Sequence, residues 1–214
     1  MTVNPNDKVF VVNENINTQY GGVDPTGQFQ TIGELKGYKS YVALLRQKGD
    51  GTTETQSSGL LNVGRTYEIA YNSPGMDFTN VGAPNNEVGT FFVSTGGSPK
   101  SWGIDEGDEN ILQTTQGAPL ARVLENTIGN VWFQYNDVGL YSANSNNLFS
   151  ENKTTVSLSP NGYIDSPTDV YTNDVSWRVD QTDSIDILTH YNNNFQDDVL
   201  NYGGTAMIEI RVYN

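Results

Sequence analysis

The sequence of 214 residues lacks cysteine altogether and holds a single histidine, His190. Without cysteine there are no disulfides, no thiolate zinc sites and no cysteine nucleophile. One histidine is also too few for a multi-histidine metal site. The chain has no G-x-S-x-G nucleophile elbow and neither of the two common glycine-rich nucleotide loops. We therefore predict a protein that is not an enzyme and uses no cofactor.

Basic residues are also scarce. Eleven Lys and Arg stand against 25 Asp and Glu, which gives a formal net charge of −14. Direct nucleic-acid binding needs a basic stripe that displaces counterions from phosphates, and the few basic residues are scattered along the chain. An anionic membrane surface would repel the same charge. The composition therefore argues against nucleic-acid and membrane partners.

Long apolar runs are missing too. No run approaches the roughly 18 residues of a membrane helix. The first twelve residues, MTVNPNDKVFVV, have neither the basic start nor the apolar stretch of a secretory signal. We expect synthesis in a cytoplasm, with export, if any, by another route such as assembly into a virus particle that is released by lysis.

What the sequence has in abundance is period-2 alternation broken by Gly, Asn, Asp and Pro. In the C-terminal run TAMIEIRVYN, Ala206, Ile208 and Ile210 share one face, and Glu209 and Arg211 lie on the other. Similar runs recur about every ten residues, with weak helix signals at Thr31 to Lys36 and after Asn194. This spacing predicts an all-β fold, an antiparallel sandwich or a barrel-like domain with little helix.

The turn-forming residues between the alternating runs also predict how the chain is divided into domains. The runs YKSYVALLRQ and GAPLARVLEN are expected to be neighbouring strands of one sheet, although a long stretch separates them. We assign residues 38–51 and 117–214 to a main β domain and residues 52–116 to an inserted β-hairpin module. Loop closure costs little extra with length, so such an insertion is tolerable. Residues 1–37 are assigned to an N-terminal attachment or arm segment.

Two acidic clusters and the histidine are the candidates for chemistry. The clusters lie at Asp105 to Glu109 and at Asp180 to Asp186, and His190 shares a strand face with Asp186. Paired carboxylates could hydrolyse glycosides or bind Ca²⁺. Solvated acidic loops and a structural histidine are the simpler interpretation, and we assign no catalytic, cofactor or metal residue.

Aromatic residues are candidates for stacking on sugar rings. We select Trp102, Tyr135 and Tyr141 as possible glycan or partner contacts. Trp102 lies in the loop SPKSWGID and is expected to be partly exposed. Trp132 and Trp177 lie inside alternating strands, where core packing is the favoured interpretation.

The stretch Ala121 to Asn136, ARVLENTIGNVWFQYN, alternates at both ends around a polar centre. Val131 and Phe133 are predicted to face opposite to Trp132. The segment ENTIGN is predicted to be the turn of a β-hairpin, in which Asn126, Gly129 and Asn130 are suited to positive φ angles.

Two parts of the chain resemble modules of structural proteins from tailed bacteriophages. The first resembling part runs from YVALLRQ to the later APLARVLENTIGNVWFQYNDVGLY. It is carried by Tyr41, Ala43, Leu44, Leu45, Gln47, Ala118, Pro119, Ala121, Val123 to Gly129, Trp132, Gly139 and Tyr141. The second lies in the insertion and is carried by Asp77 to Ala83, Gly89, Phe92, Thr95, Gly96, Pro99 and Trp102.

The resemblance implies a non-enzymatic virion structural protein, such as a capsid decoration protein, a head fibre or a tail accessory protein. Its expected partners are further copies of itself, in a homotrimer, and other virion proteins. It would be made in the host bacterial cytoplasm without a signal peptide and be located in the virion. The alternative is a carbohydrate-binding module that recognises a host surface glycan.

Overall fold

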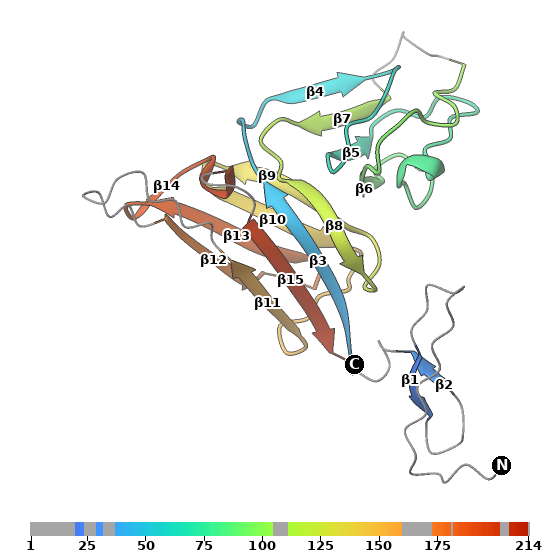
Figure 1. Ribbon diagram of the computed structural model, residues 1–214. Coiled ribbons are helices and arrows are strands. Elements are labelled where there is room, and N and C mark those ends of the chain that lie inside the picture. Colours follow the sequence, from blue (N-terminus) through green and yellow to red (C-terminus); the bar gives the residue numbers. More distant parts are fainter. Residues whose placement is uncertain are drawn as a thin grey trace, which may run out of the picture.

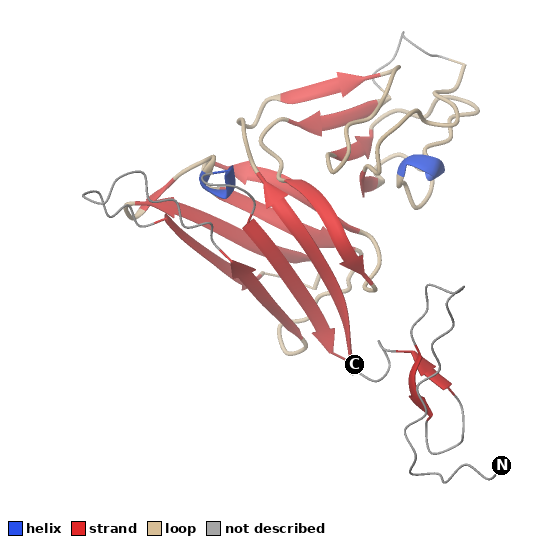
Figure 2. Ribbon diagram, viewed as in Figure 1, coloured by secondary structure: helices blue, strands red, loops and turns tan. Residues whose placement is uncertain are grey.

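The computed structural model describes residues 20–23, 29–31, 37–104, 111–159, 173–180, 182–201 and 206–213. Nearly all regular structure in these ranges is β-strand, and the helical content is two short 3₁₀ turns, η1 (Thr79–Val81) and η2 (Val199–Asn201) (Figure 2). The predicted all-β class with little helix is confirmed. The segment after Asn194 does contain a short helical turn, η2, but Asn194 is not its N-cap, because Asn194 lies in the short strand β14 (Asn194–Phe195).

Two antiparallel sheets form the main domain (Figure 1). The first has the order β11 (Thr154–Ser159), β15 (Ala206–Tyr213), β3 (Tyr38–Arg46) and β8 (Leu120–Asn126). The second has the order β12 (Asn173–Val179), β13 (Ser184–Tyr191), β10 (Leu140–Ser145) and β9 (Val131–Asp137), and β14 pairs with β13. Strands β3 and β8 are direct neighbours, as predicted, although the inserted stretch lies between them in the sequence.

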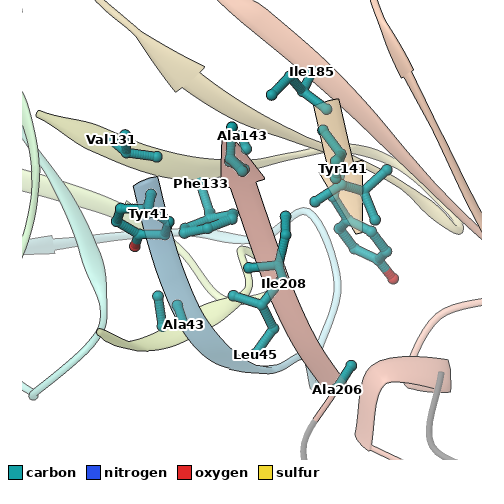
Figure 3. Packing of buried hydrophobic residues seen from close by; sticks show 14 of the residues in the cluster. Tyr41, Ala43, Leu45, Val131, Phe133, Tyr141, Ala143, Ile185, Ala206 and Ile208 are labelled. Atoms are coloured by element: carbon teal, nitrogen blue, oxygen red, sulfur yellow. The ribbon is translucent and has the colours of Figure 1, made fainter. Parts of the chain in front are cut away.

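The two sheets face each other across one hydrophobic core, so the main domain is a sandwich (Figure 3). Tyr41 on β3 and Phe133 on β9 come from opposite sheets, and their ring centroids are 6.1 Å apart. The alternation predicted for β15 is confirmed, because Ala206, Ile208 and Ile210 are fully buried. No strand pairing joins the two sheets in the described ranges, so the barrel alternative does not apply.

The inserted stretch forms a third sheet of its own. Its order is β4 (Thr53–Gln56), β7 (Leu112–Thr115), β5 (Thr66–Ile69) and β6 (Phe91–Val93). We call it, with its loops, the module. It is larger than the single hairpin that was expected, although β5 and β6 do pair with each other. A separate core fills it, with the rings of Phe78, Phe92 and Trp102 packed together. Strands β1 (Tyr20–Val23) and β2 (Phe29–Thr31) form a two-stranded antiparallel sheet.

The module is attached along one side of the sandwich, where β8 and β9 are the terminal strands of their sheets (Figure 1). The amide of Ala121 on β8 donates to the carbonyl of Gly64 at 2.8 Å. The amide of Phe133 on β9 donates to Oγ1 of Thr66 at 3.1 Å. An unpaired edge strand is open to unwanted pairing, and these contacts cover part of both edges.

The segment between β8 and β9 is a corner between sheets and not the turn of a hairpin. The two strands belong to different sheets, so the predicted hairpin is wrong. Oδ1 of Asn126 accepts the amides of Ile128 and Gly129, both at 3.1 Å, and its Nδ2 donates to the carbonyl of Gly129 at 2.7 Å. Gly129 has the expected positive φ of 135°, whereas Asn126 and Asn130 do not have positive φ.

Candidate functional site

A polar groove lies between the module and the outer face of the sandwich. Its floor is formed by β9 and β10, and one wall is formed by the module segment from Pro84 to Phe91. Its volume is about 460 Å³. Small-molecule sites usually enclose a few hundred to a thousand cubic ångströms, so the groove is of ligand size. We call it the amide groove after the side chains that line it.

Strand geometry brings the polar side chains of β9 to the outer surface. Val131 and Phe133 point into the core, so Trp132 and Gln134 point to the opposite face, as predicted for Trp132. On the neighbouring strand Asn144 lies opposite Trp132 and Ser142 lies opposite Gln134. The even-numbered residues of two strands therefore form one surface.

An aromatic pair joins the module to this surface. The rings of Phe91 and Trp132 stack with centroids 5.6 Å apart and planes 9° from parallel. Both side chains are half-buried and both line the groove. The amide Nδ2 of Asn130 also donates to the carbonyl of Phe91 at 2.8 Å. These contacts fix the module wall against the sheet floor.

Amide side chains supply the hydrogen-bonding groups of the groove. Nδ2 of Asn144 donates to Oε1 of Gln134 and to Oγ of Ser142, each at 3.0 Å. Among the described residues these bonds leave Nε2 of Gln134 as a donor and Oδ1 of Asn144 as an acceptor for another molecule. Asn85, on the module wall, is held by the amide of Glu87, which donates to its Oδ1 at 2.9 Å.

Charge is sparse in the amide groove. Asp183 is the one charged side chain among the described residues that line it, and it is exposed. The described lining includes no Lys, Arg or His. An anionic ligand would therefore meet no counter-charge here, in a chain whose net charge is already −14.

The aromatic residues selected from the sequence lie elsewhere. Trp102 is only 6% exposed, because its ring packs edge-on against Phe78 at 5.3 Å in the module core. Tyr141 is 0% exposed. The expectation that Trp102 is partly exposed is wrong, and neither ring offers a face to a ligand. Conversely, Trp177 is 39% exposed and Trp132 is half-buried, so core packing of these two was also the wrong interpretation.

Tyr135 and Tyr141 belong to a hydrogen-bonded cluster around Asp197. The hydroxyl of Tyr135 donates to Oδ2 of Asp197 at 3.0 Å, and that of Tyr141 donates to Oδ1 at 2.8 Å. The amide of Gly139 also donates to Oδ1 at 2.9 Å. Burial, together with the carboxylate beside it, raises the pKa of Tyr135 to about 12 and raises the pKa of Tyr141 further. The cluster ties the segment after β14 to β9 and β10.

The other candidates for chemistry are occupied by structural contacts or lie outside the described residues. Arg178 contacts the carboxylate of Asp186 at 2.7 Å, and the ring of His190 lies 4.5 Å from that of Phe195. Asp105 to Glu109 lie outside the described residues. Where the structure describes the chain, no three His, Cys, Asp or Glu side chains gather in a way that could hold a metal ion.

Comparisons with protein families, with curated proteins and with solved structures find no match to this chain. Among the helical segments that the structure describes, none has the length and apolar character needed to cross a membrane.

The sequence contained a signal for the amide groove that the prediction did not use. Trp132 and Gln134 alternate with the buried Val131 and Phe133, and Asn144 alternates with the buried Ala143 and Ser145. The alternation places these residues on an outer face, but it does not say which strands are neighbours. The module wall, which makes the surface concave, is not visible in the pattern at all.

Proposed function

We propose that this chain is a non-enzymatic structural protein of a tailed-bacteriophage virion, acting through assembly contacts as a capsid decoration protein, head fibre or tail accessory protein. The proposal starts from the resemblance of two parts of the sequence to virion modules. The observation that supports it is where the resembling residues lie in the fold. Many of them lie in the two packed cores or at sharp turns, and Val123 to Glu125 lie on the exposed part of β8.

In the first resembling part, Ala43, Leu45 and Ala121 are buried between the sheets, and Asn126 and Gly129 form the corner between β8 and β9. A pattern of this kind specifies a scaffold and not a reaction. It fits a protein whose work is to present surfaces to its neighbours.

In the second resembling part, Phe92 and Trp102 fill the module core. Gly82 has a φ of 112°, and a Cβ there would lie 2.6 Å from the carbonyl oxygen of Val93. Only glycine fits such a position. The resembling residues thus define the module as a building block attached to the sandwich, an arrangement suited to a virion accessory protein.

Light scattering on the purified full-length chain tests the proposal. Virion fibres and capsid threefold positions favour closed symmetric assemblies, so we expect a homotrimer with three times the chain mass of 23.5 kDa. A chain that stays strictly monomeric over a wide concentration range, and does not associate with phage particles, would argue against the proposal.

Glycan recognition is the second candidate function, and the amide groove is the observation that favours it. Its site is the pair Phe91 and Trp132 with the amides around them, in place of Trp102, Tyr135 and Tyr141. The two functions are compatible, because an accessory protein on a particle surface can bind host glycans.

A further inference from the structure

We propose that the amide groove is a binding site for a neutral oligosaccharide, which contacts Gln134 and Asn144 through its hydroxyl groups and packs on the edge of the Phe91–Trp132 stack. This inference rests on the second candidate function and assigns its site and the chemical class of its ligand.

The aromatic pair provides the apolar part of the site. Sugar rings carry C–H faces that pack on aromatic side chains, and a half-buried ring offers contact area without ordering a flexible chain. Phe91 comes from the module and Trp132 from the sandwich, and their parallel stack at 5.6 Å leaves both at the surface of the groove. The ligand would therefore contact both parts of the molecule.

The amides provide the polar part. A sugar hydroxyl both donates and accepts a hydrogen bond, and an amide side chain has the complementary donor and acceptor. The hydrogen bond between Asn144 and Gln134 orients the two side chains. It leaves Nε2 of Gln134 as a donor and Oδ1 of Asn144 as an acceptor for the ligand. Two amide side chains paired in this way can hydrogen-bond to sugar hydroxyl groups, and no charged side chain is needed.

The charge distribution selects against acidic sugars. A carboxylate or sulfate on the ligand would approach Asp183 with no basic side chain among the described lining residues to compensate. Like charges in proximity are disfavoured, and the net charge of −14 adds to the repulsion at a distance. Together with the uncharged amides, this favours uncharged hexose and N-acetylhexosamine chains over acidic sugars.

The site is also held in place before the ligand arrives. Asn130 fixes the carbonyl of Phe91, Glu87 fixes Asn85, and Thr66 contacts the backbone of β9. Preorganisation of this kind reduces the entropy lost on binding. It also distinguishes the groove from a surface depression between two loosely connected parts.

The test is a glycan array on the full-length chain, followed by calorimetric titration with the strongest neutral oligosaccharide on it. The array carries neutral hexose and N-acetylhexosamine oligosaccharides beside sialylated and uronate-containing ones. Gln134→Ala and Asn144→Ala each remove one of the two hydrogen-bonded amide side chains of the groove. Asn136→Ala is the matched control, because Asn136 is exposed on β9, two residues after Gln134, lies outside the groove lining, and contacts the polar network only through a long 3.5 Å bond from Oγ of Ser142.

We expect binding to neutral glycans, weakened about fivefold or more by Gln134→Ala and by Asn144→Ala, and unchanged by Asn136→Ala, since each groove variant loses a hydrogen bond to the ligand. Gln134 and Asn144 lie on the outer face of the sheet, so alanine at either position leaves the core intact. Circular dichroism verifies that each variant is folded.

Three results would overturn the inference, and they are distinguishable. Binding to neutral glycans that the groove variants do not affect would refute the site and leave the glycan function standing. A preference for acidic glycans would refute the ligand class. No binding to any glycan on the array would refute both the site and the second candidate function, while the virion proposal is decided separately by light scattering and particle composition.

Discussion

The interior of the sandwich depends on a few large aromatic side chains. Phe133 is 0% exposed and packs against Tyr41 of the opposite sheet. We predict that Phe133→Ala lowers the free energy of unfolding by about 3–5 kcal/mol, because it leaves a cavity between the sheets. Leu124→Ala is the control. Leu124 is 54% exposed, and its loss should change the stability by less than about 0.5 kcal/mol in the same urea titration.

Comparing Gly64 with Gly75 separates steric crowding at the junction with β8 from backbone strain at a positive φ angle. Gly64 and Gly75 have φ angles of 79° and 81°, but a Cβ at Gly64 would lie 2.6 Å from the carbonyl oxygen of Ala121, whereas one at Gly75 would meet nothing within 4 Å. Both alanine variants carry backbone strain. We predict that Gly64→Ala costs about 1–3 kcal/mol more than Gly75→Ala in chemical denaturation, because it also pushes the module away from β8. Equal losses would show that the junction tolerates the added atom.

Tyrosines whose pKa is raised by the fold predict how the stability depends on pH. The folded state raises the pKa of Tyr135 to about 12 and raises those of Tyr41 and Tyr141 as well. The unfolded chain releases these protons near pH 10, so the folded state binds more protons above that pH. The stability that these groups contribute is complete below about pH 10 and is lost as the pH rises toward and beyond 12.

Ultraviolet titration of phenolate formation measures this. We expect some of the twelve tyrosines to ionise only when circular dichroism also reports unfolding. Ionisation of all twelve near pH 10 in a chain that keeps its native spectrum would contradict the prediction.

At the scale of elements, the corner between β8 and β9 connects the two sheets. Asn126 makes three hydrogen bonds within the corner. The amide of Thr127 donates to the carbonyl of Ser40 on β3 at 2.8 Å. The corner therefore holds the end of β8 against its neighbouring strand.

We predict that Asn126→Ala lowers the free energy of unfolding by about 1–2 kcal/mol, comparable to the loss of a helix cap. Asn126→Asp keeps the oxygen that accepts from Ile128 and Gly129, so it should retain most of this stability. Thermal unfolding of both variants beside Asn136→Ala provides the comparison. An equal effect of all three substitutions would mean that the corner hydrogen bonds contribute nothing specific.

The elements also show what could be predicted from the sequence. Strand β15 alternates with period 2, and the structure buries the predicted face of Ala206, Ile208 and Ile210. Strands β4 and β7 were missed, because TETQ and LQTT carry too few apolar residues to alternate.

Alternation also does not identify a strand's partner. Both a hairpin and a corner fit the stretch ENTIGN, and only the pairing of β8 with β3 and of β9 with β10 distinguishes them. The exposure of Trp102 and Trp132 was misjudged for a related reason, since it depends on long-range neighbours, Phe78 for one and Phe91 for the other.

In the part of the chain that the structure describes, two separately packed β units meet at a junction, and that junction creates both the covered strand edges and the amide groove. Many of the resembling residues lie in the interior of the two units, and others, such as Leu124, are exposed. A structural protein of a particle needs such a rigid frame, while its outer surfaces are left to make contacts with partners.

Our proposal that the chain is a component of a phage particle can be tested by quantitative mass spectrometry of gradient-purified particles, separated into heads and tails. The particles are taken from a lysate in which the chain is produced. We expect peptides of this chain in a fixed stoichiometry with the other virion proteins of one sub-particle. Abundant chain in the lysate with none in the purified particles would contradict it.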